Sequence, residues 1–176
     1  MGLGLYGADL HLLSYASRHA GLQGVENKVL TLTQADGHPV TGARNLVIVP
    51  DLIIHEETTF SFIALLVCDQ GMVMVTVVGD GSSTTLSQVG DIVPKVQAVS
   101  VVSKLKHILV VTKESDDSNE LSVSSFPKSK LMECSNTGLC SPADWAFNTH
   151  WAGAGRLRQA YHVGQARLHH HAVHQH

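Results

Sequence analysis

The sequence predicts a mainly β protein made of antiparallel hairpins, with a partial β-propeller as the favoured architecture and a β-sandwich as the alternative. From Asn27 onward, β-branched and apolar runs alternate with clusters of Gly, Pro, Asp and Ser, which is the pattern of short strands and turns. Two sets of such runs begin at Phe62 and His107, about 45 residues apart. A period of about 40–45 residues with several strands per unit is typical of propeller blades.

Composition divides the chain into three regions, residues 1–26, 27–130 and 131–176. In the first region Asp9 is a candidate N-cap, Leu10 and Leu13 lie at helical spacing, and Gly21 is a stop signal. We therefore expect one short helix there, outside the core. The second region is the expected β-rich core.

The clearest β unit in this core has Phe62–Cys68 (FIALLVC) and Met72–Val78 (MVMVTVV) on either side of Asp69-Gln70-Gly71, a predicted three-residue hairpin loop. A second unit contains the runs Val96–Val102, Ile108–Thr112 and Leu121–Phe126. Phe62–Cys68, Met72–Val78 and Val96–Val102 are nearly continuously apolar, as in strands that are buried on both faces. We predict that one contiguous core contains Ile63, Leu65, Val67, Val73, Val75, Val99, Val101, Ile108 and Val110.

The stretch Phe62–Phe126 resembles two consecutive blades of a divergent WD-repeat-like propeller. Its order of apolar strand, short turn, strand and long polar loop is similar to the non-catalytic WD-repeat subunits of tRNA guanine-N7 methyltransferases, although the Trp-Asp dipeptide is absent. The resemblance covers about a third of the chain and implies a scaffold that binds a protein partner. Because closed propellers use about 4–8 blades, it also implies a truncated subunit or a part of a larger assembly.

Charge and hydropathy argue against direct binding of nucleic acid or membrane. The net charge is −3, from 12 Lys+Arg and 15 Asp+Glu, so we expect contact with nucleic acid only through a partner. The apolar stretch Phe60–Gly79 contains Asp69 at its middle, which would cost about 2.5–3.5 kcal/mol at a bilayer centre. Two strands and a turn fit this stretch better than a membrane span.

The start of the chain and the cysteine count favour the cytoplasm or the nucleus. The first residues lack the basic segment of a secretory signal, and Asp9 and His11 interrupt the apolar stretch that such a signal needs. The sequence has three cysteines, and an odd number leaves at least one thiol unpaired. A reducing compartment is the simpler interpretation.

Histidines are concentrated in the third region, where His170 and His174 would share one face of a helix. Neutral imidazoles are good ligands for Zn, Cu and Ni. No acidic residue follows Asp144 to orient such ligands, so we expect an unstructured tail with adventitious metal affinity and no cofactor. A metal-binding protein remains the alternative function, and its candidate ligands are His169, His170, His171, His174 and His176.

Two cysteines and two histidines of the third region resemble a zinc-ligand set only in composition. Cys134, Cys140, His150 and His162 do not have the C-x₂₋₄-C and H-x₃₋₅-H spacings that place zinc ligands on a hairpin and a helix. We expect a loop with two free thiols instead, with a local disulfide as the alternative if the chain meets oxidising conditions.

The sequence contains no motif of nucleophilic catalysis, such as a G-x-S-x-G elbow. Lys104 and Lys106 alternate with Leu105 and His107, and lysines at the end of a strand commonly protect a sheet edge. We therefore expect a non-enzymatic interaction scaffold. An aberrant or truncated isoform without a selected function is a further alternative.

Overall fold

The structure, a computed structural model, is mainly β, with one short helix in the part of the chain that it describes. It describes residues 2–18, 21–49, 54–55, 59–79, 83–115, 120–138 and 148–152, with the side chains of all but 14–18, 21–26, 54–55 and 148–152. The described strands pair in antiparallel fashion throughout. The predicted mainly β fold class with antiparallel pairing is therefore confirmed.

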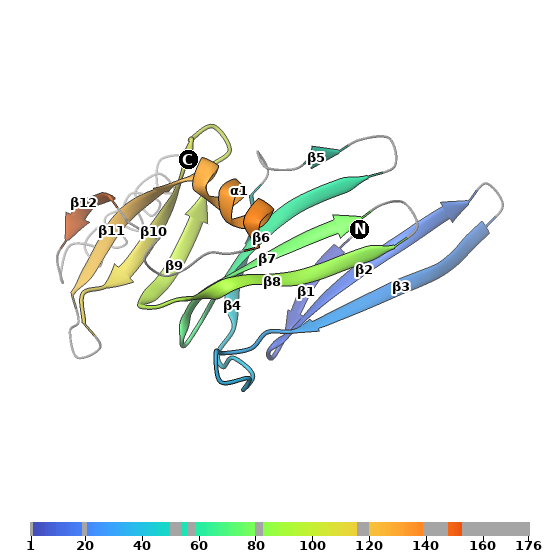
Figure 1. The fold of residues 1–176 in the computed structure, drawn as a ribbon, viewed down its shortest axis with the longest axis horizontal. Coiled ribbons are helices and arrows are strands. Elements are labelled where there is room, and N and C mark those ends of the chain that lie inside the picture. The colour runs from blue at the N-terminus through green and yellow to red at the C-terminus, as the bar shows by residue number, and fades with distance from the viewer. Residues whose placement is uncertain are drawn as a thin grey trace, which may run out of the picture.

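The strands form three sheets that follow one another along the chain (Figure 1). The N-terminal sheet has the order β1-β2-β3, with strands at Gly2–Tyr6, Asp9–Arg18 and Gly21–Thr31. The middle sheet has the order β4-β6-β7-β8, with strands at Arg44–Ile48, Phe60–Cys68, Gly71–Gly79 and Thr84–Val93, and β5 (Ile54–His55) pairs with β6. The C-terminal sheet has the order β9-β10-β11-β12, with strands at Val96–Val101, His107–Lys113, Leu121–Pro127 and Asn148–Ala152; α1 (Lys128–Thr137) follows β11.

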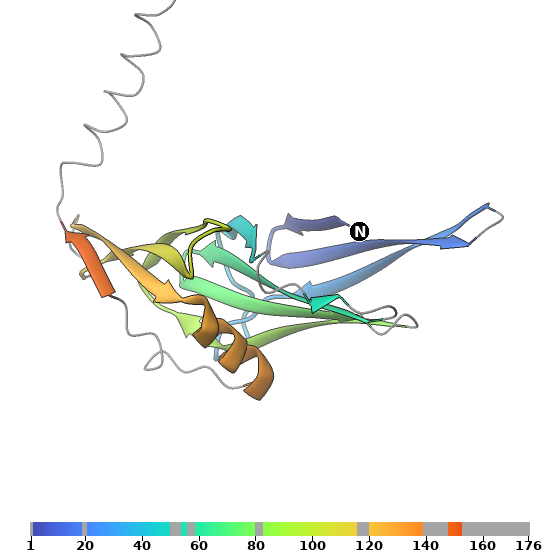
Figure 2. The same ribbon diagram turned by 90° about the horizontal axis from the view of Figure 1, so that it is seen from above.

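The middle sheet lies between the other two and is covered on both faces (Figures 1 and 2). Successive side chains of a strand point to opposite faces. Ile63 and Leu65 of β6 therefore pack with Ile108 of β10, whereas Leu66 of the same strand packs with Leu10 of β2. This double burial explains why β6 and β7 are almost continuously apolar.

The predicted β6–β7 hairpin is confirmed, but its loop has two residues rather than three. Cys68 pairs with Gly71, whereas a three-residue loop would pair Cys68 with Met72. Gly71 has φ 138°, a value that favours glycine. The shorter loop shifts the register of β7 by one residue against β6.

This shift reverses the faces to which the side chains of β7 point. Val73 and Val75 face the N-terminal sheet, so the prediction that they share a core with Leu65 is wrong. The other predicted core residues lie between the middle and C-terminal sheets, with Val101 packed against them: Ile63, Leu65, Val67, Val99, Ile108 and Val110.

The N-terminal region forms strands, so the helix predicted after Asp9 is wrong. Leu3 pairs with Leu12 and Leu5 pairs with Leu10, which places alternate leucines on one face. Leu10 and Leu12 are fully buried against the middle sheet, and β3 crosses the predicted boundary after residue 26. The two-residue spacing of the leucines, rather than the weak helical spacing, decides the local structure. It places the leucines of β1 and β2 on one face, which packs on the middle sheet.

The start of the C-terminal region is ordered, in contrast to the disorder expected over residues 131–176. The helix α1 places Leu131 and Cys134 in the core, and β12 pairs with β11. The helix begins after Pro127 and ends at Gly138, whose φ of 67° is typical of a residue that ends a helix. Residues 139–147 and 153–176 lie outside the described part of the chain.

Candidate functional site

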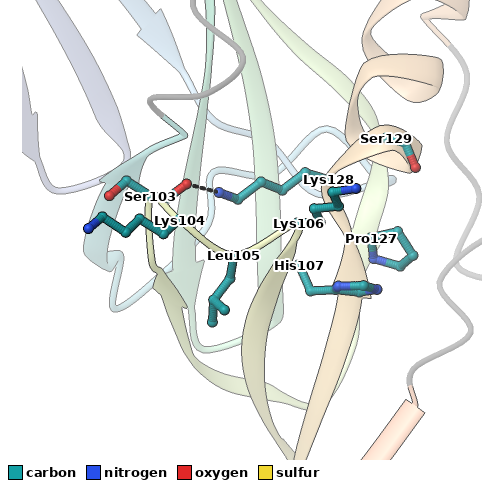
Figure 3. A pocket seen from close by; sticks show the side chains of 8 residues that line it. All are labelled: Ser103, Lys104, Leu105, Lys106, His107, Pro127, Lys128 and Ser129. Carbon is teal, nitrogen blue, oxygen red and sulfur yellow. Dashed lines mark hydrogen bonds between the residues drawn. The ribbon is translucent and has the colours of Figure 1, made fainter.

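A basic pocket lies where the β9–β10 turn meets the start of α1, and its volume is about 600 Å³ (Figure 3). The turn contributes residues 103–107, and the β11–α1 junction contributes residues 127–129. These segments are distant in sequence but adjacent in space because β10 pairs with β11. The lining residues are Ser103, Lys104, Leu105, Lys106, His107, Pro127, Lys128 and Ser129.

Backbone hydrogen bonds hold the two segments that line this pocket in place. The Leu105 amide donates to the Val102 carbonyl over 3.1 Å and closes the turn. The Lys128 amide donates to the Lys106 carbonyl over 2.9 Å, which continues the β10–β11 ladder beyond its last pair. Pro127 is extended, with φ −64° and ψ 132°, and the helix starts at the next residue. A proline suits this N-cap position because its ring holds φ near the observed value and the amide that it lacks makes no hydrogen bond within the helix.

Lys128 connects the two segments through its side chain. The side chain extends from the start of α1 to the turn (Figure 3), where Nζ donates to the carbonyls of Val102 at 3.0 Å and Ser103 at 3.4 Å. The residue is only 5% exposed. A buried ammonium is costly unless it is hydrogen-bonded, so these carbonyls determine where the side chain lies. We therefore assign Lys128 a structural role, in which it holds the turn against the helix.

The accessible cations of the pocket come from the turn, where Lys104 and Lys106 are exposed. The eight lining residues include no carboxylate. The first turn of α1 also has no acidic residue, so the partial positive charge of the helix N-terminus is not neutralised by a side chain of that turn. Leu105 adds an apolar side chain that is 45% exposed. The pocket therefore combines positive charge with apolar surface, which is suited to binding a ligand with anionic and apolar groups.

The structure leaves the predicted metal ligands untested. His169, His170, His171, His174 and His176 all lie outside the described residues. Among the residues that the structure does describe, no group of three or more His, Cys, Asp or Glu side chains could hold a metal ion.

The cysteine pair of the predicted loop is also only partly described. Cys134 is disulfide-bonded and buried on α1, so the prediction of a free thiol at this residue is wrong. Cys140 and His162 lie outside the described residues, and for His150 only the backbone in β12 is described.

Cys68 is a free cysteine at the end of β6. Its burial raises the pKa of the thiol, a change that the backbone hydrogen bonds of Gln70 and Gly71 oppose. A thiol with a raised pKa is protonated at neutral pH and weakly nucleophilic. Cys68 therefore acts as a small apolar core residue.

The sequence indicated only part of the pocket. Lys104 and Lys106 were recognised in the sequence, but they were interpreted as residues that protect a sheet edge. The contribution of Pro127, Lys128 and Ser129 depends on the pairing of β10 with β11 and on α1, which was not predicted. Pro127, followed eleven residues later by Gly138, was the available signal for that helix.

No protein-family model matches this sequence, and neither a characterised protein nor a solved structure is significantly similar to the chain. Among the described residues, no helix has the length and hydrophobicity needed to span a membrane.

Proposed function

We propose that this chain is a non-enzymatic protein-interaction scaffold built as part of a divergent WD-like β-propeller. The topology supports this proposal. The C-terminal sheet is a four-stranded meander, β9-β10-β11-β12, and the five-stranded middle sheet contains the four-stranded path β4-β6-β7-β8, with β5 paired to β6. Propeller blades are four-stranded antiparallel sheets of this kind.

The stacking of the sheets supports the same proposal. The first strands of the middle and C-terminal sheets, β4 and β9, are in contact, and the last strands of the N-terminal and middle sheets, β3 and β8, are also in contact. Side chains hold neighbouring sheets together. Gln88 Oε1 accepts from the Thr33 amide at 3.0 Å while its Nε2 donates to the Thr33 carbonyl at 2.8 Å. Asn45 Nδ2 donates to the Val99 carbonyl at 3.2 Å.

The observation that carries the scaffold function is the outer face of the N-terminal sheet. This face exposes Tyr6 (81%), Leu13 (38%) and Val29 (51%) next to the polar residues Asp9, His11, Asn27 and Thr31, while Leu10 and Leu12 on the opposite face are buried. Side-chain atoms at Gly2 and Gly4 would meet open space. Exposed apolar side chains on a sheet face are where a further sheet would stack in a propeller, so the partner is expected to cover them.

The test compares capture of proteins from native lysate by the wild-type chain and by the double variant Leu13→Lys/Val29→Lys. We expect the wild type to enrich a discrete partner by quantitative mass spectrometry and the double variant to lose it, because two lysines make the face polar. A matched control is Ile48→Lys/Val78→Lys, which changes two other exposed apolar strand residues, at 42% and 49% exposure. A monomer that enriches nothing, or equal capture by both double variants, contradicts the proposal.

We place this scaffold in the cytoplasm or the nucleus. The buried free thiol of Cys68 is compatible with a reducing compartment, whereas the disulfide at Cys134 is the observation against it. Fluorescence localisation of the full chain tests this part of the proposal, and accumulation in the secretory pathway would contradict it.

A further inference from the structure

We infer that the basic pocket between the β9–β10 turn and α1 binds an acidic peptide segment that also carries an apolar side chain. The pocket belongs to the C-terminal sheet, so this is a different surface from the open face of the N-terminal sheet. The inference adds the chemistry of a ligand to the proposed scaffold and rests on that proposal only in taking the ligand to be a protein segment.

Charge complementarity is the first step. Lys104 and Lys106 are exposed on the turn, and His107 also lines the pocket. With no carboxylate among the lining residues, an incoming anion does not have to displace an internal ion pair at the wall. Complementary charge of this kind increases the association rate and disfavours basic or neutral competitors.

The position of Lys128 makes the pocket preorganised. Its ammonium donates to the carbonyls of Val102 and Ser103, so the turn is fixed beside the helix before any ligand arrives. A binding wall that is already ordered loses less conformational freedom on binding.

Size and apolar surface favour a peptide over a small anion. A volume of about 600 Å³ lies within the range of about 300–1,000 Å³ that is typical of ligand pockets, and it exceeds what one oxyanion fills. Leu105 and Pro127 offer apolar contacts next to the lysines. A segment that alternates glutamate with leucine can use both kinds of contact at once.

Nucleic acid fits the same pocket less well. Binding of single strands commonly depends on stacking of bases on aromatic side chains. The lining residues include no Phe, Tyr or Trp, and the net charge of the chain is −3. The acidic peptide is therefore the favoured ligand.

The experiment titrates the full chain into a short fluorescein-labelled peptide of glutamate and leucine and follows fluorescence anisotropy. We expect saturable binding that weakens as KCl increases, and at least a roughly tenfold loss of affinity in Lys104→Glu/Lys106→Glu because both cations become repulsive. The matched control Lys95→Glu/Lys113→Glu makes the same charge change at the other end of β10 and is expected to bind within about threefold of the wild type. Circular dichroism melting establishes that each variant is folded.

Several outcomes would overturn the inference. These are equal binding of a peptide with glutamine in place of glutamate, equal loss in the two double variants, or tighter binding of a single-stranded oligonucleotide than of the peptide. Saturation by inorganic phosphate at the same concentration as the peptide would also overturn it, because it would show a simple oxyanion site. If the peptide does not bind this pocket, the open face of the N-terminal sheet can still capture a protein partner. The two proposals are therefore tested separately.

Discussion

At the scale of single residues, Gly71 determines how β7 is aligned with β6. Its φ of 138° is a conformation that residues with a side chain rarely adopt. A Cβ atom at this position would overlap the carbonyl oxygen of Val93, because the end of β8 passes directly over the turn. The register that divides the apolar residues of β7 between two cores therefore depends on the absence of a side chain here.

We predict that Gly71→Ala lowers the free energy of unfolding by about 3 kcal/mol, through backbone strain and the steric overlap with Val93. Urea denaturation followed by circular dichroism measures this change. Gly4→Ala is the control, because a Cβ at Gly4 on β1 meets open space and is expected to change stability by less than about 0.5 kcal/mol. Equal losses at the two glycines would contradict the role given to Gly71.

At the scale of elements, the β9–β10 turn and α1 stabilise each other through one buried ammonium. We predict that Lys128→Met destabilises the protein by about 1–3 kcal/mol, because methionine keeps the apolar part of the side chain but leaves the Val102 and Ser103 carbonyls without their donor. Thermal and urea denaturation measure the loss.

Lys130→Met is the matched control for this element. Lys130 lies on the same helix, its Nζ is 2.6 Å from Glu133 Oε2, and its side chain is 52% exposed. Exposed ion pairs contribute about 0–1 kcal/mol, so this variant is expected to stay close to the wild type. If Lys128→Met were as stable as Lys130→Met, the buried ammonium would not be holding the turn.

The elements that sequence patterns missed have a common physical reason. β8 has polar residues at alternate positions and only partial burial at Leu86 and Gln88, so its pattern is weak. It is a strand because β7 pairs with it from Thr84 to Val89 and again at Val93. The helix α1 likewise has few apolar residues, and Leu131 is held by the core that lies beneath it.

At the scale of the whole molecule, the middle sheet is shared by two cores, so we expect the described sheets to unfold together. We predict that Leu66→Ala, on the N-terminal side, and Ile108→Ala, on the C-terminal side, each lower the free energy of unfolding by about 2–5 kcal/mol. Each variant should still show a single transition.

Coincident near-UV and far-UV circular dichroism melting curves would establish this cooperativity. Leu105→Ala is a control, since Leu105 is 45% exposed and contributes little to either core. Two separate transitions, with Leu66→Ala affecting only one of them, would show that the N-terminal sheet is an independent unit.

Local sequence patterns were sufficient for the strands whose residues are apolar over their whole length. Phe62–Cys68 and Met72–Val78 were predicted within two residues of the strands observed, because strands buried on both faces need little information from elsewhere. The mainly β class followed from these runs and from the turn residues between them.

Tertiary structure decided the features that depend on partners distant in the chain. Leu10 and Leu12 are buried because the middle sheet lies beneath them, which a local helical spacing could not reveal. A loop of two residues rather than three moved Val73 and Val75 to the opposite face, since one residue of register reverses every side chain of a strand. The basic pocket required β10 and β11 to place Lys106 beside Lys128. The charge and polarity of these side chains follow from the sequence, but the side chains come close together only when the sheets have formed.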